Sequence, residues 1–316
     1  MSGYDIIGDI HGHAAELEAL LKAMGYTRQQ GTWQHSERQA LFVGDFIDRG
    51  PEQLRSVDIV RRMVDAGSAQ AVMGNHEFNA IAWYLRGEHG QPLREHSDKN
   101  RHQHSKFLAD VVEGSVRHRE HIDWFLSLPL WLELDEINII HACWHQDYMA
   151  RFADKLISGH RLSDELMQEA ARVPDDASHI TLFHAIEAWL KGVEIPLPDG
   201  IAFKDKDGHE RRNARLKWWR DTPVDFFDAL VGAKEDLRQA LYGHVLPAES
   251  RLIYNHPNPV FFGHYWMNGE PVVDNRRAIC VDYSVANGGR LVAYRWGGDG
   301  PAHPKKMFFL TRRVGE

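Results

Sequence analysis

The chain has 316 residues, of which 43% are hydrophobic and 26% charged, an ordinary composition for a globular protein with a sizeable core. Its formal net charge of -8 argues against a binder of duplex nucleic acid, because such proteins present a basic face to the phosphates. The N-terminus lacks the basic start and apolar region of a signal peptide, and no apolar run approaches the ~20 residues that span a bilayer. We therefore expect a cytoplasmic protein without membrane attachment.

Short apolar runs in the first third of the chain predict three buried strands, at residues 4–7, 41–43 and 71–73. Apolar residues at helical spacing follow each run and predict helices at residues 14–24, 51–66 and 75–85. This alternation is typical of a largely parallel sheet with helices on its faces. Such sheets carry ligand sites at the carboxyl ends of their strands.

The middle of the chain departs from this alternation. Residues 31–39 form a polar connection, and residues 87–105, polar and histidine-rich, predict a surface excursion. One helix is expected over 106–128, followed by a hairpin of strands at 130–134 and 137–140.

A helical pattern returns over 148–192, and residues 193–224 are the least regular part of the chain. Glycine-punctuated runs then predict antiparallel strands at 260–262, 278–281, 290–296 and 307–310. Because no repeat or flexible linker interrupts the sequence, we expect a single α/β domain over 1–316 with a helical and irregular insertion at about 146–258.

The cysteines and most histidines indicate no site of their own. Cys143 and Cys280 are far apart and form no CxxC pair, which argues against a disulfide framework and a thiolate zinc site. Of the 20 histidines, most lie in polar surroundings where a solvated position is the simplest expectation. Examples are His89, His96, His102, His104, His118 and His121.

Three glycine-containing motifs follow the first three predicted strands: GDIHG at 8–12, GDFIDRG at 44–50 and GNHE at 74–77. Their side chains, with a later histidine at the end of a strand, offer oxygen and imidazole ligands without thiolate, which suit Mn, Fe, Zn or Ni. The candidates are Asp9, His11, Asp45, Asn75 and His141. Asp45, in the middle motif, is the natural bridge between two cations, and two metals ~3.5–4 Å apart can clamp a phosphate and activate a water.

In series, these motifs resemble the signature of the calcineurin-like metallophosphoesterase superfamily, especially its branch of serine/threonine protein phosphatases and symmetrical diadenosine tetraphosphate hydrolases. The resemblance covers residues 4–85, 120–145 and 259–296. It implies central mixed β-sheets in a β-sandwich flanked by helices. It also implies a two-metal phosphoesterase that hydrolyses phosphate esters or anhydrides by attack of a metal-bound hydroxide, with Mn the favoured metal.

By motif position, the resemblance implies that Asp9, His11 and Asp45 hold the first metal. Asp45, Asn75, His141 and a late histidine would hold the second. Two glycine-histidine pairs compete for that last position: His264, which we favour because its flanking strand pattern matches the tetraphosphatase-like members, and His244.

The resemblance also assigns roles to the second and third motifs. Arg49 would grip a phosphate oxygen bidentately, and Asn75 would contact substrate as well as metal. Asp48 would orient His76, which could then protonate the departing oxygen. Alternatively, Asp48 forms only a salt bridge to Arg49. Glu77, in the first turn of a helix, is expected to be structural.

Two features depart from the family pattern. Where relatives continue with glycines, His141 is followed by Ala142, Cys143 and Trp144, and we expect Cys143 to be a buried, inert thiol. The family also places a further arginine on the substrate, and a basic string offers candidates, of which Arg212 and Arg215 are favoured. Trp218 and Trp219 could stack on a nucleobase beside this string or belong to the core.

The sequence does not decide which substrate the protein acts on. A phosphorylated small molecule, a dinucleotide such as a diadenosine polyphosphate, and a serine/threonine phosphoprotein all fit one scaffold. A catalytically inactive nucleotide-binding module is an alternative of a different class, although every expected ligand type is present. A nuclease is a third, but the net acidic charge is unfavourable for duplex binding.

Overall fold

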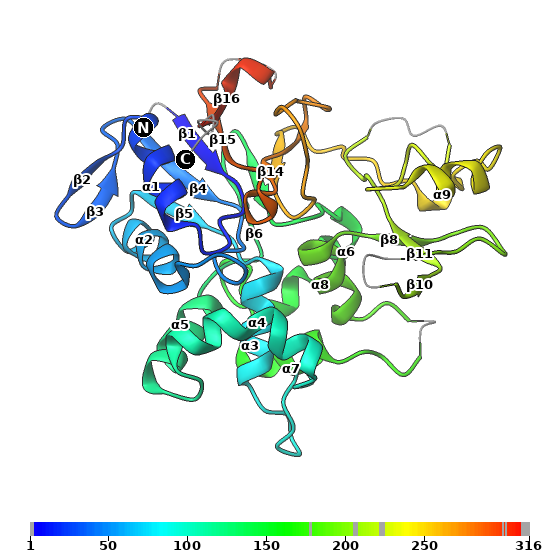
Figure 1. Cartoon of the computed structure of the whole chain (residues 1–316), viewed down its shortest axis with the longest axis horizontal. Helices are drawn as coiled ribbons and strands as arrows, with labels where there is room; N and C mark the ends of the chain where they lie inside the picture. Colours follow the sequence, from blue (N-terminus) through cyan, green and yellow to red (C-terminus); the bar gives the residue numbers. More distant parts are fainter. Residues whose placement is uncertain are drawn as a thin grey trace.

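The computed structural model describes residues 3–176, 179–204, 208–220, 225–298, 300 and 302–310. Two central mixed sheets carry the fold (Figure 1). One has the strand order β14-β15-β1-β4-β5, with β16 also pairing to β15, and the other has the order β13-β12-β7-β6. Within the described part of the chain, no helix is both long and apolar enough to cross a bilayer.

The first sheet begins with the predicted parallel strands. β1 (Gly3–Ile7) pairs in parallel with β4 (Arg38–Phe42), and β4 with β5 (Ala69–Ala71). β15 (Arg290–Trp296) runs antiparallel to β1 and to its other neighbours, β14 (Asp282–Tyr283) and β16 (Met307–Phe309). Because parallel β1, β4 and β5 end at one edge of the sheet, the three motif loops meet there.

Side-chain alternation along the strands separates two cores. Ile7 and Phe42 belong to the larger cluster with the helices, whereas Ile6 and Leu41 join a second cluster that includes Phe261 of the other sheet. Successive strand residues point to opposite faces, so each inner strand packs helices on one side and the other sheet on its opposite side. The expected α/β fold with a β-sandwich is therefore confirmed.

The outer face of the first sheet is covered by α1 (Ala14–Ala23) and α2 (Gln53–Asp65). In α1 the buried residues Leu17, Leu20 and Leu21 recur at i, i+3 and i+4, the spacing of one helix face. The third motif opens α3 (Asn75–Tyr84), so its residues stand at a helix N-terminus beside the ends of β1 and β4.

Two predictions, one for the polar connection at 31–39 and one for the helix at 106–128, were wrong. The connection after α1 contains a hairpin of β2 (Thr27–Gln29) and β3 (Thr32–Gln34), closed by Gln30 and Gly31 at φ 50° and 83°, as two-residue hairpin turns require. The single helix expected over 106–128 is two, α4 (Asp98–Val111) and α5 (Val116–Leu126), because the chain turns between them with Val112 at φ 61°.

The second sheet contains the predicted hairpin, β6 (Trp131–Glu133) with β7 (Asn138–Ile140), paired antiparallel. β12 (Val260–Phe262) pairs in parallel with both β7 and β13 (Ala278–Cys280). The expectation that all late strands are antiparallel was therefore wrong for β12 and β13. It was right for β15 and β16.

The described residues within 146–258 form short helices and strands joined by irregular segments, in the centre and on the right of Figure 1. The helices are α6 (Gln146–Phe152), α7 (Asp164–Ala171), α8 (Leu182–Lys191) and α9 (Glu235–Ala240), with 3-10 turns at Ala153–Lys155 and Ala248–Ser250. Two more 3-10 turns, Val285–Asn287 and Pro304–Lys306, lie later in the chain. The strands are β8 (Glu194–Pro196), β9 (Phe203–Lys204), β10 (Glu210–Arg211) and β11 (Asn213–Arg215). That these parts form one domain stays a prediction.

Candidate active site

The motif loops fit together because glycines let them touch. A Cβ atom on Gly74 would lie 2.3 Å from Asp45 Oδ1, and one on Gly263 would lie 2.0 Å from Asp9 Oδ1. No larger residue fits at either position without moving the side chain of Asp45 or Asp9. His11 and Asp45 adopt left-handed conformations at φ 47° and 53°, uncommon for residues with a Cβ and typical of functional sites.

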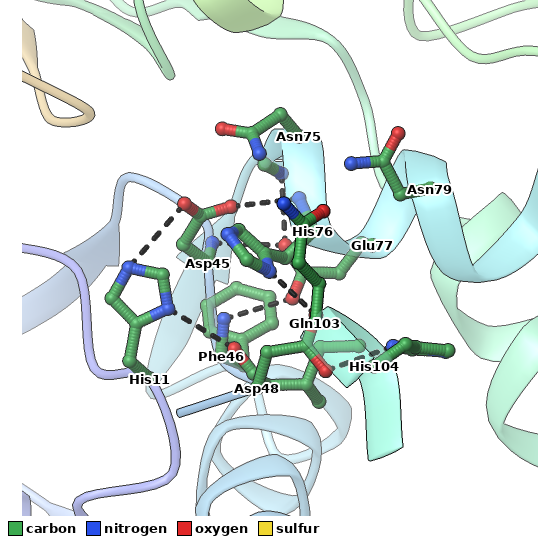
Figure 2. A network of polar contacts seen from close by, with 12 residues as sticks. His11, Asp45, Phe46, Asp48, Asn75, His76, Glu77, Asn79, Gln103 and His104 are labelled. Atoms are coloured by element: carbon green, nitrogen blue, oxygen red, sulfur yellow. Dashed lines mark hydrogen bonds and ion pairs between the residues drawn. The ribbon is translucent and has the colours of Figure 1, made fainter. Parts of the chain in front are cut away.

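Asp45 stands between two imidazoles. Its Oδ2 lies 3.6 Å from His11 Nε2, and its Oδ1 accepts the backbone N–H of His76 at 3.0 Å (Figure 2). The same Oδ2 lies 3.5 Å from His141 Nε2. Burial works to raise the pKa of Asp45, but the neighbouring imidazoles, His141 first, outweigh it and lower the pKa. Asp45 is therefore held in its ionised form, with one imidazole on each side.

The two histidines present their Nε2 atoms to Asp45 because their other nitrogens are occupied. His11 Nδ1 donates to Ile47 O at 3.1 Å, and His141 Nδ1 donates to Val43 O at 2.7 Å. Such backbone contacts fix the tautomer of metal-binding histidines and leave Nε2 with a free electron pair. Burial lowers the pKa of His11 to about 3, which keeps that pair available.

A second group of ligand atoms gathers on the other side of Asp45. One ligand atom each of Asp45, His141 and His264 lies within 4.8 Å of the others. Asn75 Oδ1 lies among them, 3.1 Å from His141 Nε2 and 2.8 Å from His264 Nδ1. The structure thus brings His264 to the cluster, whereas His244 is exposed after α9.

Asp9 completes the cluster from the first loop. Its Oδ2 accepts the backbone N–H of His264 at 3.0 Å, while its Oδ1 is buried without a hydrogen-bond partner among the described residues, as is His11 Nε2. Burial, with Asp282 and Asp45 nearby, raises the pKa of Asp9. Buried polar atoms without partners are costly, so these two atoms fit a cation in contact with both.

Next to this cluster lies a histidine-carboxylate-histidine chain. His76 Nδ1 donates to Asp48 Oδ2 at 2.5 Å, and His104 Nδ1 donates to Asp48 Oδ1 at 2.8 Å (Figure 2). Burial works to raise the pKa of Asp48, but the charge and hydrogen bonds of His104 and then His76 lower it well below its usual range. Asp48 therefore contacts His76, as the resemblance implies, and the charge on Asp48 is shared by two imidazoles.

Glu77 fixes the second and third motif loops through hydrogen bonds. Its carboxylate accepts the backbone N–H groups of Asp45, Phe46 and Gly74 at 2.8, 2.8 and 3.0 Å. Burial, followed by the charge of Asp45, raises the pKa of Glu77 to about 7. The side chain is fully buried and faces backbone amides, in agreement with the structural role expected for it.

The arginines divide into those near the cluster and those outside it. Arg49 lies over the Trp266 ring, with its guanidinium carbon 4.6 Å from the ring centroid. Arg215 Nη1 lies 3.2 Å from His264 Nε2. Arg212, in contrast, is exposed and pairs with Glu210 at 3.0 Å, so the structure does not bring it to the site.

Two hypotheses about apolar neighbours are now resolved. Trp218 and Trp219 are each 2% exposed and belong to the core, so the idea that they stack on a nucleobase was wrong. Cys143 is fully buried, and burial raises the pKa of its thiol. This agrees with the expected inert thiol.

A model of the calcineurin-like phosphoesterase family matches residues 4–265, a span that contains every loop of the cluster. The chain belongs to the calcineurin-like phosphoesterase family. Among solved structures of low sequence identity, the cold-active protein-tyrosine phosphatase of a psychrophilic Shewanella has the same fold, with a TM-score of 0.51 at 16% identity over 98% of this chain and 81% of that one.

Curated relatives match a little under half of this chain. The asymmetrical bis(5'-nucleosyl)-tetraphosphatase PrpE of Oceanobacillus iheyensis is 35% identical over 139 residues, covering 44% of this chain and 54% of PrpE. PrpE of Geobacillus thermodenitrificans is 36% identical over 155 residues, covering 48% and 62%. The chain thus spans about half to three fifths of the length of these relatives.

The calcineurin-like resemblance did not reveal His104, and the expectation that His104 and His118 are solvated was wrong. His104 is 5% exposed and His118 is 1% exposed. A sequence signal existed: His104, Phe107 and Val111 recur at i, i+3 and i+7, so His104 lies on the buried face of α4.

Proposed function

We propose that this protein is a metal-dependent phosphoesterase, a phosphoric ester hydrolase with two divalent cations, Mn favoured. The observation that carries this proposal is the Asp45 carboxylate, whose Oδ2 lies 3.6 Å from His11 Nε2 and 3.5 Å from His141 Nε2. A buried carboxylate with imidazoles on both sides is the arrangement needed to bridge two cations.

The donor set fits such cations. In this proposal Asp9, His11 and Asp45 would hold the first metal, and Asp45, Asn75, His141 and His264 would hold the second. These are oxygen and imidazole donors without thiolate, which suit Mn, Fe, Zn or Ni. When bound, a pair of cations polarises the phosphoryl group and lowers the pKa of a coordinated water.

The remaining residues position the substrate and move a proton. In this proposal His76, held by Asp48 through its Nδ1, gives a proton from Nε2 to the departing oxygen. Burial works to lower the pKa of His76, but the carboxylates of Asp45 and Asp48 outweigh it and raise the pKa, which favours the protonated imidazole that an acid needs.

Arginine side chains are the phosphate contacts of the proposal. Arg49 brings a planar guanidinium from the second motif loop, suited to bidentate contact with phosphate oxygens. Arg215 lies against His264 Nε2. With a cation on His264 Nδ1, Nε2 would carry the ring proton and could not accept from Arg215, so this guanidinium would be free to donate to a phosphate oxygen.

Among substrates we favour a dinucleoside polyphosphate. The support is the identity of 35% over 139 residues and 36% over 155 residues to two proteins named bis(5'-nucleosyl)-tetraphosphatases. Those relatives are named asymmetrical enzymes, so we expect cleavage of diadenosine tetraphosphate to AMP and ATP. A phosphoprotein substrate would place the same cluster over a phosphoserine instead.

A substrate panel tests the proposal. The purified chain with added Mn²⁺ is assayed on p-nitrophenyl phosphate, diadenosine tetraphosphate and a phosphoserine peptide, with Asp45→Asn as the inactive control and Asp65→Asn on the exposed end of α2 as the matched one. We expect hydrolysis of diadenosine tetraphosphate that Asp45→Asn abolishes. No turnover of any substrate, with no bound metal, would favour an inactive nucleotide-binding module.

A further inference from the structure

The insertion contributes a cavity next to the cluster of candidate metal ligands. The cavity has a volume of about 440 Å³ and lies between the sheet of β8 and β11 and the segment that leads into α9. Small-molecule sites usually occupy ~300–1,000 Å³, so this cavity has room for a nucleoside. Arg215 lines it and also contacts His264.

Arg215 connects the cavity to the cluster at short range. One guanidinium nitrogen, Nη1, lies 3.2 Å from His264 Nε2, and the other, Nη2, lies 3.1 Å from Glu194 Oε1. Glu194 is its cross-strand partner on β8 and lines the cavity too. A ligand in the cavity is therefore separated from the metal ligands by one arginine head group.

The far wall is fixed to the same strand. The backbone N–H of Val231 donates to Arg215 O at 2.9 Å, and Leu216 forms an isolated bridge with Leu230. These contacts hold the segment before α9 against β11. The position of the cavity relative to Arg215 is therefore set by backbone hydrogen bonds as well as by side-chain packing.

The lining combines an apolar floor with a cationic rim. Leu230 and Leu237 are buried, and the half-buried ring of Phe203 lies beside them. The rim carries more cationic side chains than carboxylates. The carboxylates are those of Glu194 and Asp236, and the cationic side chains are those of Lys204, Arg211, Arg215 and Lys234. An apolar surface with one aromatic ring suits a nucleobase, and the cations suit phosphates.

We propose that this cavity binds one nucleoside of a dinucleoside polyphosphate while Arg215 contacts the phosphate chain between the cavity and the metal cluster. This inference rests on the proposed function and deepens it by giving the nucleoside a place in the insertion. A phosphopeptide is less well matched, because an extended backbone needs an open groove with hydrogen-bonding partners and this floor is apolar.

The experiment measures kcat/KM of the full chain with Mn²⁺ for diadenosine tetraphosphate, p-nitrophenyl phosphate and a phosphoserine peptide. Leu237→Trp fills the cavity, and Lys234→Glu reverses a charge on its rim at an exposed position. Matched controls are Val245→Trp, an exposed position that does not line the cavity, and Lys22→Glu in the last turn of α1.

We expect the ratio of kcat/KM for diadenosine tetraphosphate to that for p-nitrophenyl phosphate to fall about tenfold in both cavity variants, mainly through KM. The controls should stay within about twofold of the wild type. If the ratio is unchanged in Leu237→Trp and Lys234→Glu and phosphatase activity is intact, the cavity does not bind the nucleoside. The proposed phosphoesterase activity is not affected by that result. A selective loss on the phosphopeptide overturns the nucleoside assignment, and a wild type inactive on all three substrates overturns the proposed function itself.

Discussion

The carboxylate of Glu77 accepts the backbone N–H of Asp45 at 2.8 Å, so a buried side chain of α3 fixes the loop that carries the central carboxylate. Asp45 is held at φ 53°, a left-handed conformation that costs a residue with a Cβ roughly 1–2 kcal/mol. The hydrogen bonds from Asp45, Phe46 and Gly74 to Glu77 offset this cost. The geometry of the cluster therefore depends on a residue that is not itself one of the proposed ligands.

Glu77→Gln tests this dependence. The glutamine has the same size, but its NH₂ group must face a backbone N–H, and a buried donor left without an acceptor costs about 1–3 kcal/mol. We expect a loss of that size in the free energy of unfolding, measured in urea, together with a lower bound metal content. Glu235→Gln, in the exposed first turn of α9, is the control. Equal stability and metal content in Glu77→Gln would contradict the argument.

His104 should act through Asp48. Without the His104 hydrogen bond, Asp48 Oδ1 loses its 2.8 Å partner and the carboxylate can turn away from His76. We expect His104→Ala to lower kcat about tenfold with a smaller change in KM, since the effect falls on proton transfer. His104→Asn, whose amide can donate from nearly the same place, should recover part of kcat.

The matched control for His104 is His102→Ala, two residues earlier on α4 and exposed. Thermal unfolding of all three variants separates positioning from folding. If His104→Ala and His104→Asn lose stability equally and keep the wild-type kcat, His104 is only a core residue.

Arg215 and Arg212 can be compared directly. Arg215 contacts His264, whereas Arg212 is exposed and paired with Glu210. Because charge-assisted contacts to phosphate are strong, we expect Arg215→Ala to lower kcat/KM for diadenosine tetraphosphate by roughly tenfold or more. Arg212→Ala should change it less. A larger effect from Arg212→Ala would restore the sequence-based assignment of that residue to the substrate.

The buried side chain of His118 should make the stability of the folded state depend on pH. Burial, with His104 nearby, lowers its pKa to about 4, and Gly114 N–H donates to its Nδ1 at 3.1 Å, so the folded state holds the neutral ring. The unfolded chain, with a histidine pKa of about 6.5, binds the extra proton first as pH falls. Stability should therefore decrease between about pH 6.5 and pH 4, by at most about 3 kcal/mol from this group.

Urea unfolding at pH 7 and pH 5 measures this effect. His118→Gln removes the titrating group, so the loss of stability on going to pH 5 should be smaller than in the wild type, while His102→Gln should behave like the wild type. An identical pH dependence in His118→Gln would mean that other groups account for the acid sensitivity.

The motif residues were predictable because each lies within a few positions of a strand end, where parallel topology forces convergence. Asp9 lies two residues after the end of β1, and Asp45 lies three residues after the end of β4. His104 was missed because it reaches Asp48 from a helix 56 residues further along the chain, and the contact depends on how α4 packs rather than on local pattern.

Other errors have the same physical origin. Arg212 and Arg215 are equally basic in the sequence, and only the pairing of β11 with β8 decides which one turns toward His264. The parallel pairing of β12 with β7 joins segments more than 100 residues apart in sequence, and short apolar runs carry no information about strand direction. The expectation for 106–128 failed at Val112, a β-branched residue that sequence reasoning would not place at positive φ.

The most direct test of the two-metal account is the metal content of the protein. After dialysis against Mn²⁺ and removal of excess, elemental analysis should find about two Mn per wild-type chain, as the shared carboxylate requires, and clearly fewer in Asp45→Asn. The control Asp65→Asn should match the wild type. A wild-type chain that binds no Mn, Fe, Zn or Ni, or an Asp45→Asn variant that keeps the full content, would contradict the account.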